Sequence, residues 1–262
     1  MLLMRGKIRI GIELIDKCIP KGFPKDSLVV IHGPPGVGKT IMLRQILSHR
    51  LLNGDYCIVI CLENPPLSFL KSLSEMNIDV DLYIKKRKLF VFDCFSHLIK
   101  HIPIKPTSLP ECIIRVDDPL KFDKLLVMVY ELIERLGFSA NGCVFVDTFT
   151  ELLFSKDVFT AINWLKSLRA LFAKTLGLLT VVTHHTHKQF EVFDETIPAI
   201  ADVSIKVRYN PILLQKGMGV REFMVEKVSG APNIPIWVPF LISSKGVIPY
   251  PVKEHRKKPV QQ

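Results

Sequence analysis

The sequence of 262 residues predicts an α/β fold: a mostly parallel β-sheet covered by helices on both faces, with an antiparallel β extension towards the C-terminus. Three observations predict it. Strongly apolar, β-branched runs recur along the chain, amphipathic helical patterns lie between them, and beyond Ala201 the pattern changes to shorter β-like runs separated by turns. Near-continuous apolar runs are typical of strands buried on both faces, which requires helices on both sides of the sheet.

The apolar runs place the expected core strands at residues 27–32, 56–62, 89–93, 142–147 and 179–183. Helical periodicity predicts helices at 124–136, ending at Gly137, and at 158–175. The runs 203–208, 222–227 and 236–243 are expected to be antiparallel strands added to the sheet edge, and the proline-containing stretch 101–110 to be an insertion. We expect residues 1–252 to form one domain and residues 253–262 a flexible basic tail.

The composition narrows the class of protein. A net charge of +10 suits an anionic partner such as a nucleotide or a nucleic acid. The basic clusters at 85–88 and 253–258 lack interleaved aromatic residues, so a solvated surface explains them equally well. Six cysteines without CxxC spacing or a secretory leader predict reduced thiols in a cytoplasmic protein. No apolar run approaches the roughly 20 residues of a membrane-spanning helix.

A phosphate-binding loop follows the first apolar run. Residues 33–40 fit the pattern G-x-x-x-x-G-K-[ST] at every fixed position, and an amphipathic helix follows. Glycines let backbone N–H groups turn towards a β-phosphate, a lysine reaches the β/γ-phosphates, and a threonine hydroxyl ligates magnesium. The positive end of the helix favours the same anion. The sequence therefore predicts ATP and Mg²⁺ as ligands, bound by Gly33, Pro34, Pro35, Gly36, Val37, Gly38, Lys39, Thr40 and Ile41.

Two carboxylates end apolar strands, and the carboxyl ends of parallel strands share one sheet edge. Asp147 closes the run 142–147 and is predicted to hold magnesium together with Thr40. Glu63 follows the run 56–62 and is predicted to orient and deprotonate the attacking water. A solvated strand-end glutamate is the alternative for Glu63.

Three histidines, His184, His185 and His187, follow the run 179–183. We predict that His184 and His185 contact the nucleotide, because a polar side chain at a strand end can exchange a γ-phosphate contact for another partner. Two alternatives stay open: a metal site formed by His185 and His187, and purely structural histidines.

In this order of motifs the chain resembles the KaiC/RadA-like branch of the RecA superfamily of ATPases. The likeness runs nearly end to end, through 11–16 and 22–27 before the first core strand, 62–66 and 146–153, and 225–230 with 239–251 at the C-terminus. The resemblance implies a RecA-like core and a homo-oligomeric ring, commonly a hexamer, with ATP bound between neighbours. It also implies that Lys227 reaches the γ-phosphate of the next subunit.

The chain departs from the family pattern at two positions. Ser229 stands where the family's second trans residue, an arginine, is expected, and Asn64 where a second glutamate is common. Because an arginine finger accelerates phosphoryl transfer by several orders of magnitude, the sequence predicts slow or partner-dependent hydrolysis. Two alternatives remain: a recombinase paralogue that binds DNA through its basic segments and a loop at 186–201, and a regulator that uses ATP only as a structural ligand.

Overall fold

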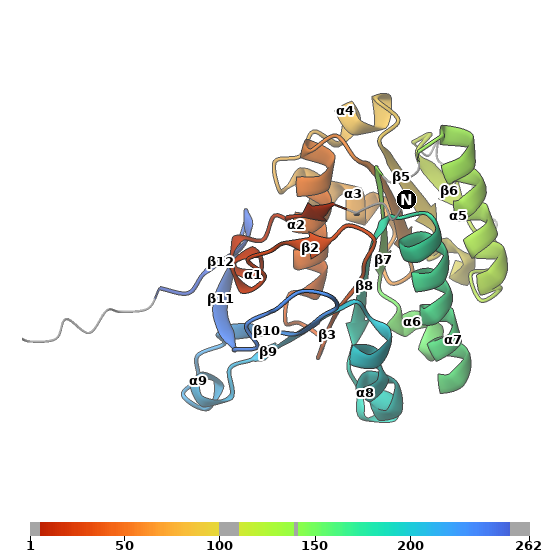
Figure 1. Ribbon diagram of the computed structural model, residues 1–262. Coiled ribbons are helices and arrows are strands. Elements are labelled where there is room, and N and C mark those ends of the chain that lie inside the picture. The colour runs from red at the N-terminus through yellow and green to blue at the C-terminus, as the bar shows by residue number, and fades with distance from the viewer. Residues whose placement is uncertain (1–5, 100–109, 139–140, 252–262) are drawn as a thin grey trace, which may run out of the picture.

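In the computed structural model, which describes residues 6–99, 110–138 and 141–251, one ten-stranded sheet forms the centre of the molecule (Figure 1). Its strand order is β12-β11-β10-β9-β3-β8-β7-β4-β5-β6. These strands are β3 Leu28–Gly33, β4 Tyr56–Cys61, β5 Leu89–Asp93, β6 Ile113–Arg115, β7 Gly142–Asp147, β8 Leu179–His185, β9 Val203–Tyr209, β10 Arg221–Val228, β11 Val238–Ser243 and β12 Gly246–Pro249. The short strands β1 (Lys7–Ile8) and β2 (Phe23–Pro24) pair separately.

Helices cover both faces of this sheet (Figure 1). They are α1 Glu13–Cys18, α2 Lys39–Leu52, α3 Pro66–Ser74, α4 Val80–Lys85, α5 Phe122–Leu136, α6 Thr150–Leu153, α7 Val158–Leu168, α8 Glu191–Ile200 and α9 Pro211–Gln215. Shorter elements are the 3₁₀ turns Ser96–Ile99 and Lys188–Phe190 and the π-helical segment Arg169–Thr175, which continues α7. None of the described helices is both long and apolar enough to cross a lipid bilayer.

Alternation along the strands divides the core into two layers. On β3, Val29 and Ile31 pack with α1 to α4, whereas Leu28 and Val30 pack with α5 to α8. Successive side chains of a strand point to opposite faces, so a strand that is apolar at every position needs cover on both sides. The predicted α/β class and the expected core strands are confirmed.

Three local expectations were wrong or incomplete. Strand β9 was expected to be antiparallel but pairs in parallel with β3; only its other edge, towards β10, is antiparallel. The stretch 186–201 was expected to be a loop and is mostly helical, since it contains α8. Strand β6 was not predicted and lies in parallel beside β5.

The remaining expectations concern one helix, the C-terminal tail, the proposed insertion and the cysteines. The helix expected at 124–136 is α5, which ends at Gly137 in the left-handed conformation with a φ of 67°. The tail at 253–262 and nearly all of the proposed insertion at 101–110 lie outside the described residues. All six cysteines are buried and unbonded to one another, as expected for reduced thiols.

Candidate functional site

The loop between β3 and α2 depends on its glycines. Gly38 has a φ of 99°, a conformation that side chains disfavour, and a Cβ at Gly33 would collide with the carbonyl oxygen of Val207 on β9. The close approach of β9 therefore requires glycine where the loop begins. The loop then leads directly into α2, so the helix N-terminus and the loop N–H groups can face the same ligand.

Lys39, the first residue of α2, is folded against the loop. Its side-chain Nζ donates hydrogen bonds to the carbonyl oxygens of Gly33 at 2.8 Å and Pro34 at 2.7 Å. Burial lowers the pKa of Lys39 to about 8, although the negative charges of Glu63 and Asp147 act to raise it. The ammonium is thus a poorly solvated cation next to the backbone that would bind a phosphate, which makes an anion there favourable.

Thr40 and Asp147 meet at the carboxyl edge of the sheet. The Thr40 hydroxyl donates to Asp147 Oδ1 at 3.0 Å, and the Thr183 hydroxyl donates to the same oxygen at 3.0 Å. The other oxygen, Asp147 Oδ2, is buried without a hydrogen-bond partner, and burial raises the pKa of this carboxyl. A buried carboxylate oxygen without a partner, beside a hydroxyl, fits the oxygen ligands that Mg²⁺ prefers.

Glu63 lies at the same edge and faces His185. Its Oε2 is 3.3 Å from His185 Nε2, and the hydrogen bond from His185 lowers the pKa of Glu63. A second carboxylate, Glu151 on α6, has its pKa raised by burial and by the charge of Glu63. Glu63 therefore stays ionised, as a general base must be before it accepts a proton.

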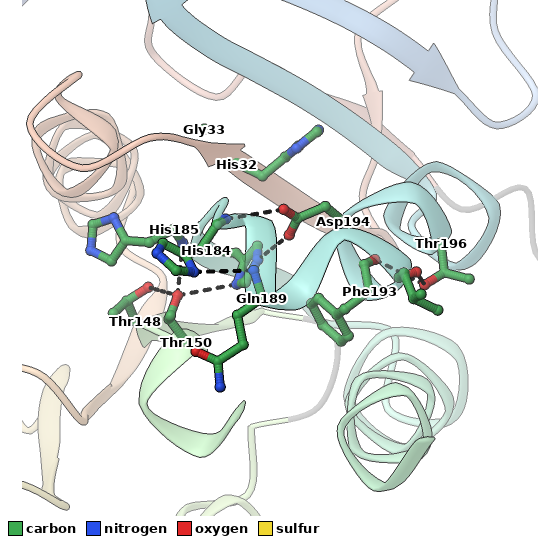
Figure 2. A network of polar contacts seen from close by, with 12 residues as sticks. His32, Gly33, Thr148, Thr150, His184, His185, Gln189, Phe193, Asp194 and Thr196 are labelled. Carbon is green, nitrogen blue, oxygen red and sulfur yellow. Dashed lines mark hydrogen bonds and ion pairs between the residues drawn. The ribbon is translucent and has the colours of Figure 1, made fainter. Parts of the chain in front are cut away.

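His184 is fully buried in a polar network with both ring nitrogens engaged (Figure 2). Its Nε2 lies 2.6 Å from Asp194 Oδ1 on α8, and its Nδ1 lies 3.1 Å from the hydroxyl of Thr150, which also accepts from the His185 backbone N–H at 2.7 Å. Burial lowers the pKa of His184. Because Asp194 accepts, the neutral ring carries its proton on Nε2 and accepts the Thr150 proton on Nδ1.

The two other histidines do not converge. His185 faces Glu63, whereas the Nδ1 of the exposed His187 accepts the backbone N–H of Gln189 at 3.2 Å. No group of three or more metal-ligating side chains occurs within the described ranges. Of the predicted pair, His185 lies at the Glu63 site and His184 lies behind it, in contact with α6 and α8.

Lys227 lies away from its own chain's phosphate loop. Its Nζ donates to the carbonyl oxygens of Pro198 at 2.7 Å and Ala201 at 3.0 Å, at the C-terminal end of α8. Lysines commonly satisfy such free carbonyls. Ser229 follows on the same segment, and its backbone N–H donates to the Asp202 carbonyl at 2.7 Å.

Two residues at the loop were missed by the sequence reasoning. Tyr209, the last residue of β9, and Arg221, the first of β10, both contact the carbonyl oxygen of Gly36. They lie 173 and 185 positions from Gly36 in the sequence. No local pattern signals such contacts, because only the sheet register brings these residues to the loop.

Comparison with known proteins shows the family of this chain. The model of the KaiC ATPase family matches residues 8–254. A UPF0273 protein of Aeropyrum pernix is 26% identical over 251 residues, which cover 95% of this chain and 96% of that protein. A UPF0273 protein of Thermotoga maritima is 31% identical over 93 residues, 36% of this chain and 38% of that protein. The circadian clock protein KaiC3 of Synechocystis is 24% identical over 212 residues, 78% of this chain but 36% of that longer protein.

The family match covers the phosphate loop, both strand-end carboxylates and the antiparallel C-terminal strands. It therefore spans every element that the site uses. The chain belongs to the KaiC ATPase family within the RecA superfamily and is an ATP-binding protein of that fold.

Proposed function

We propose that this chain is a cytoplasmic, magnesium-dependent ATPase that hydrolyses ATP slowly or only with a partner, and whose nucleotide state controls its assembly and partner binding. One observation carries the proposal: Lys39, Thr40, Asp147 and Glu63 come from three separate segments and gather at one sheet edge, linked by contacts and charge. Each has the chemistry that phosphoryl transfer requires at that place.

Each of these residues has its own role in the proposed reaction. Lys39 exchanges its loop carbonyls for the β/γ-phosphates and neutralises charge there. Thr40 and Asp147 hold Mg²⁺, which when bound polarises the phosphate oxygens. Glu63, kept ionised by His185, accepts the proton of the attacking water.

Two features support slow turnover. Ser229 has no charge to offer a neighbour's γ-phosphate, unlike the arginine that the family pattern predicts. Lys227 is held by the carbonyls of Pro198 and Ala201 and would have to leave them to reach a second subunit. In a homo-oligomeric ring, the reach of Lys227 to the nucleotide of the next subunit would thus depend on movement of the C-terminal end of α8.

We propose that the nucleotide state is transmitted through two histidines, His184 and His185, which lie in the polar network drawn in Figure 2. His185 contacts Glu63 by its side chain and Thr150 by its backbone, and Thr150 contacts His184, which contacts Asp194 on α8. The far end of α8 carries the carbonyls that bind Lys227. A shift of His185 on nucleotide binding would therefore reach Lys227 through one helix.

The test combines light-scattering mass with ATP turnover, with and without Mg²⁺-ATP and single-stranded DNA. We expect an ATP-dependent oligomer and slow turnover that Glu63→Gln abolishes, with Glu151→Gln as the matched neighbouring control. Turnover lost in Glu151→Gln and kept in Glu63→Gln would assign the base to the other carboxylate.

Other outcomes separate the alternative functions. Stimulation of ATP turnover by DNA that weakens as the salt concentration rises would support a recombination role instead. A monomer that binds ATP without turnover under any condition would contradict the ATPase and leave a regulator that uses ATP as a structural ligand.

A further inference from the structure

Strand β10 contains a β-bulge directly before Lys227. In the pairing of β10 with β9, Val225 lies opposite Ile205 but Lys227 lies opposite Ser204, so β10 advances two residues while β9 advances one. Glu226 is therefore the extra residue of β10. A bulge of this kind changes the direction of the side chains that follow it.

The bulge decides which face of the sheet Lys227 occupies. Val225 and Val228 both pack in the apolar layer with α1 to α4, although they are three positions apart. In a regular strand alternate residues share a face, so Lys227 would lie in the same apolar layer as Val225. The extra residue places it on the opposite face, where its Nζ donates to the carbonyl oxygens of Pro198 and Ala201 at the end of α8.

The side chain of Glu226 joins the bulge to two other strands. Its Oε2 accepts from the Ser204 hydroxyl on β9 at 2.8 Å and lies 2.9 Å from His32 Nε2 on β3. Its Oε1 lies 3.7 Å from Lys206 Nζ. Only 3% of the His32 side chain and 17% of the Glu226 side chain are exposed, so water competes little for the contact between them.

This carboxylate is ionised and firmly held. Burial acts to raise the pKa of Glu226, but the hydrogen bonds from His32 and Ser204 outweigh it, and the pKa is lowered. Hydrogen bonds to a charged acceptor are stronger than those between neutral groups. His32 directly precedes Gly33, the first residue of the phosphate loop (Figure 2). One carboxylate thus connects the bulge before Lys227 with the strand that carries the loop.

We propose that Glu226 is a positioning residue, which holds Lys227 on the α8 face of the sheet and ties its backbone to β3 through His32. With the backbone fixed in this way, only the lysine side chain and the end of α8 need to move for Lys227 to reach the nucleotide of the next subunit. The inference rests on the proposed function and deepens it, since Glu226 acts on the reaction only through Lys227.

The first test measures how fast an N-hydroxysuccinimide ester acylates Lys227 in the nucleotide-free protein, by mass spectrometry of the modified peptide. We expect Glu226→Ala to raise this rate by about fivefold or more, because the lysine leaves its carbonyl partners when the bulge loses its contacts. His32→Ala should raise it too. Glu222→Ala is the matched control, since Glu222 is a buried carboxylate of the same strand that pairs with Arg208 on β9.

The second test separates positioning from ATP binding. Glu226→Ala should lower the maximal turnover by about tenfold or more while ATP affinity stays within about twofold, because Lys227 acts on the transferred phosphate and not on binding by the loop. In the Lys227→Ala background it should have no further effect, because it acts through that lysine. Equal losses in both backgrounds, or an ATP affinity that falls as much as turnover, would overturn the inference.

The inference on Glu226 and the proposed function fail in different ways. An acylation rate of Lys227 that is the same in Glu226→Ala as in the parent protein would overturn the inference, whatever the turnover. Faster acylation in Glu226→Ala, with a parent protein that binds ATP without turnover, would support the positioning of Lys227 and overturn the proposed ATPase.

A second variant guards against a loss of fold. Glu226→Gln preserves the shape of the side chain and one acceptor oxygen, so it should raise the acylation rate of Lys227 by about twofold or more, but less than Glu226→Ala. Denaturant unfolding of each variant shows whether the measurements refer to folded protein. An unchanged acylation rate in a folded Glu226→Gln variant would count against the inference in the same way.

Discussion

His184 Nε2 lies 2.6 Å from Asp194 Oδ1, which joins the carboxyl end of β8 to helix α8 inside the protein. The second oxygen of Asp194 accepts the backbone N–H of His187 at 3.1 Å, so one carboxylate fixes both the ring and the chain that leaves the strand. The contact places α8 relative to the nucleotide edge.

Asp194→Ala should release His184 from its single tautomer. The Nε2–H would lose its acceptor inside the protein, which costs about 1–3 kcal/mol of unfolding free energy. Nitrogen-15 NMR of the imidazole should show the change, and denaturant unfolding its cost. Glu195→Ala, an exposed carboxylate on the same helix, is the control. An unchanged His184 spectrum in Asp194→Ala would contradict the assigned tautomer.

ATP binding should take up a proton above pH 8. Burial lowers the pKa of Lys39 to about 8, so the free ammonium loses its proton as the pH rises through that value. Bound phosphate favours the charged form and raises this pKa, so affinity should fall as the pH rises above 8. Calorimetry in buffers of different ionisation enthalpy measures the uptake, and Lys39→Arg, which stays charged, should abolish it. Equal uptake in both proteins would point to another group.

His185→Ala should raise the pKa of Glu63. The hydrogen bond from His185 is the leading cause of the lowered value, so its removal returns the carboxyl towards its ordinary pKa. Carbon-13 NMR of the Glu63 carboxyl follows the titration without reference to activity. His187→Ala is the control, because His187 does not contact Glu63. A Glu63 titration that is the same in both variants would show that another group lowers the pKa.

Asp202→Ala should destabilise the protein by about 2–4 kcal/mol, because this carboxylate joins several elements. It accepts from the Leu28 N–H at 3.0 Å, from Arg169 Nη2 at 2.9 Å and from Lys174 at 3.0 Å. Arg169 and Lys174 lie five positions apart in the π-helical segment, and a π-helix aligns residues at that spacing. Denaturant unfolding measures the loss; a cost under about 0.5 kcal/mol would contradict the role.

The carboxylate of Asp202 should also make the unfolding free energy of the protein fall at acid pH. Burial opposes its ionisation, but the hydrogen bonds from Arg169, Leu28 and Lys174 outweigh it, and the pKa of Asp202 is lowered on folding. Its contribution is therefore complete above the ordinary pKa of about 3.9 and is lost as the pH falls through the lower folded value. The difference in unfolding free energy between parent and Asp202→Asn should shrink over that range; a constant difference would contradict it.

Much of the fold was predictable from the sequence because buried strands are apolar at every position. The runs that became β3, β4, β5, β7 and β8 show this directly. The direction of β9 was not predictable, because a strand's own residues do not specify which neighbour it joins. Helix α8 was missed because it contains Pro198, whose ring is ordinarily unfavourable inside a helix.

Some residues of the candidate site were likewise predictable from the sequence, and others were not. The phosphate loop and Asp147 are visible in local patterns, since their chemistry demands fixed residue types at fixed spacing. The contacts of Tyr209 and Arg221 with Gly36 depend on strand order alone. The role of Asp194 depends on how α8 packs, which no local pattern contains.

The position of β3 between two parallel neighbours has a consequence for the motions of the site. Val29 to Ile31 are buried and bonded to β8 on one edge and β9 on the other. Amides in such a strand exchange with solvent only when much of the molecule opens. The phosphate loop is thus attached to a strand whose amides should exchange slowly, and we expect adjustment to a ligand to come from side chains and from α8 rather than from the strand that carries the loop.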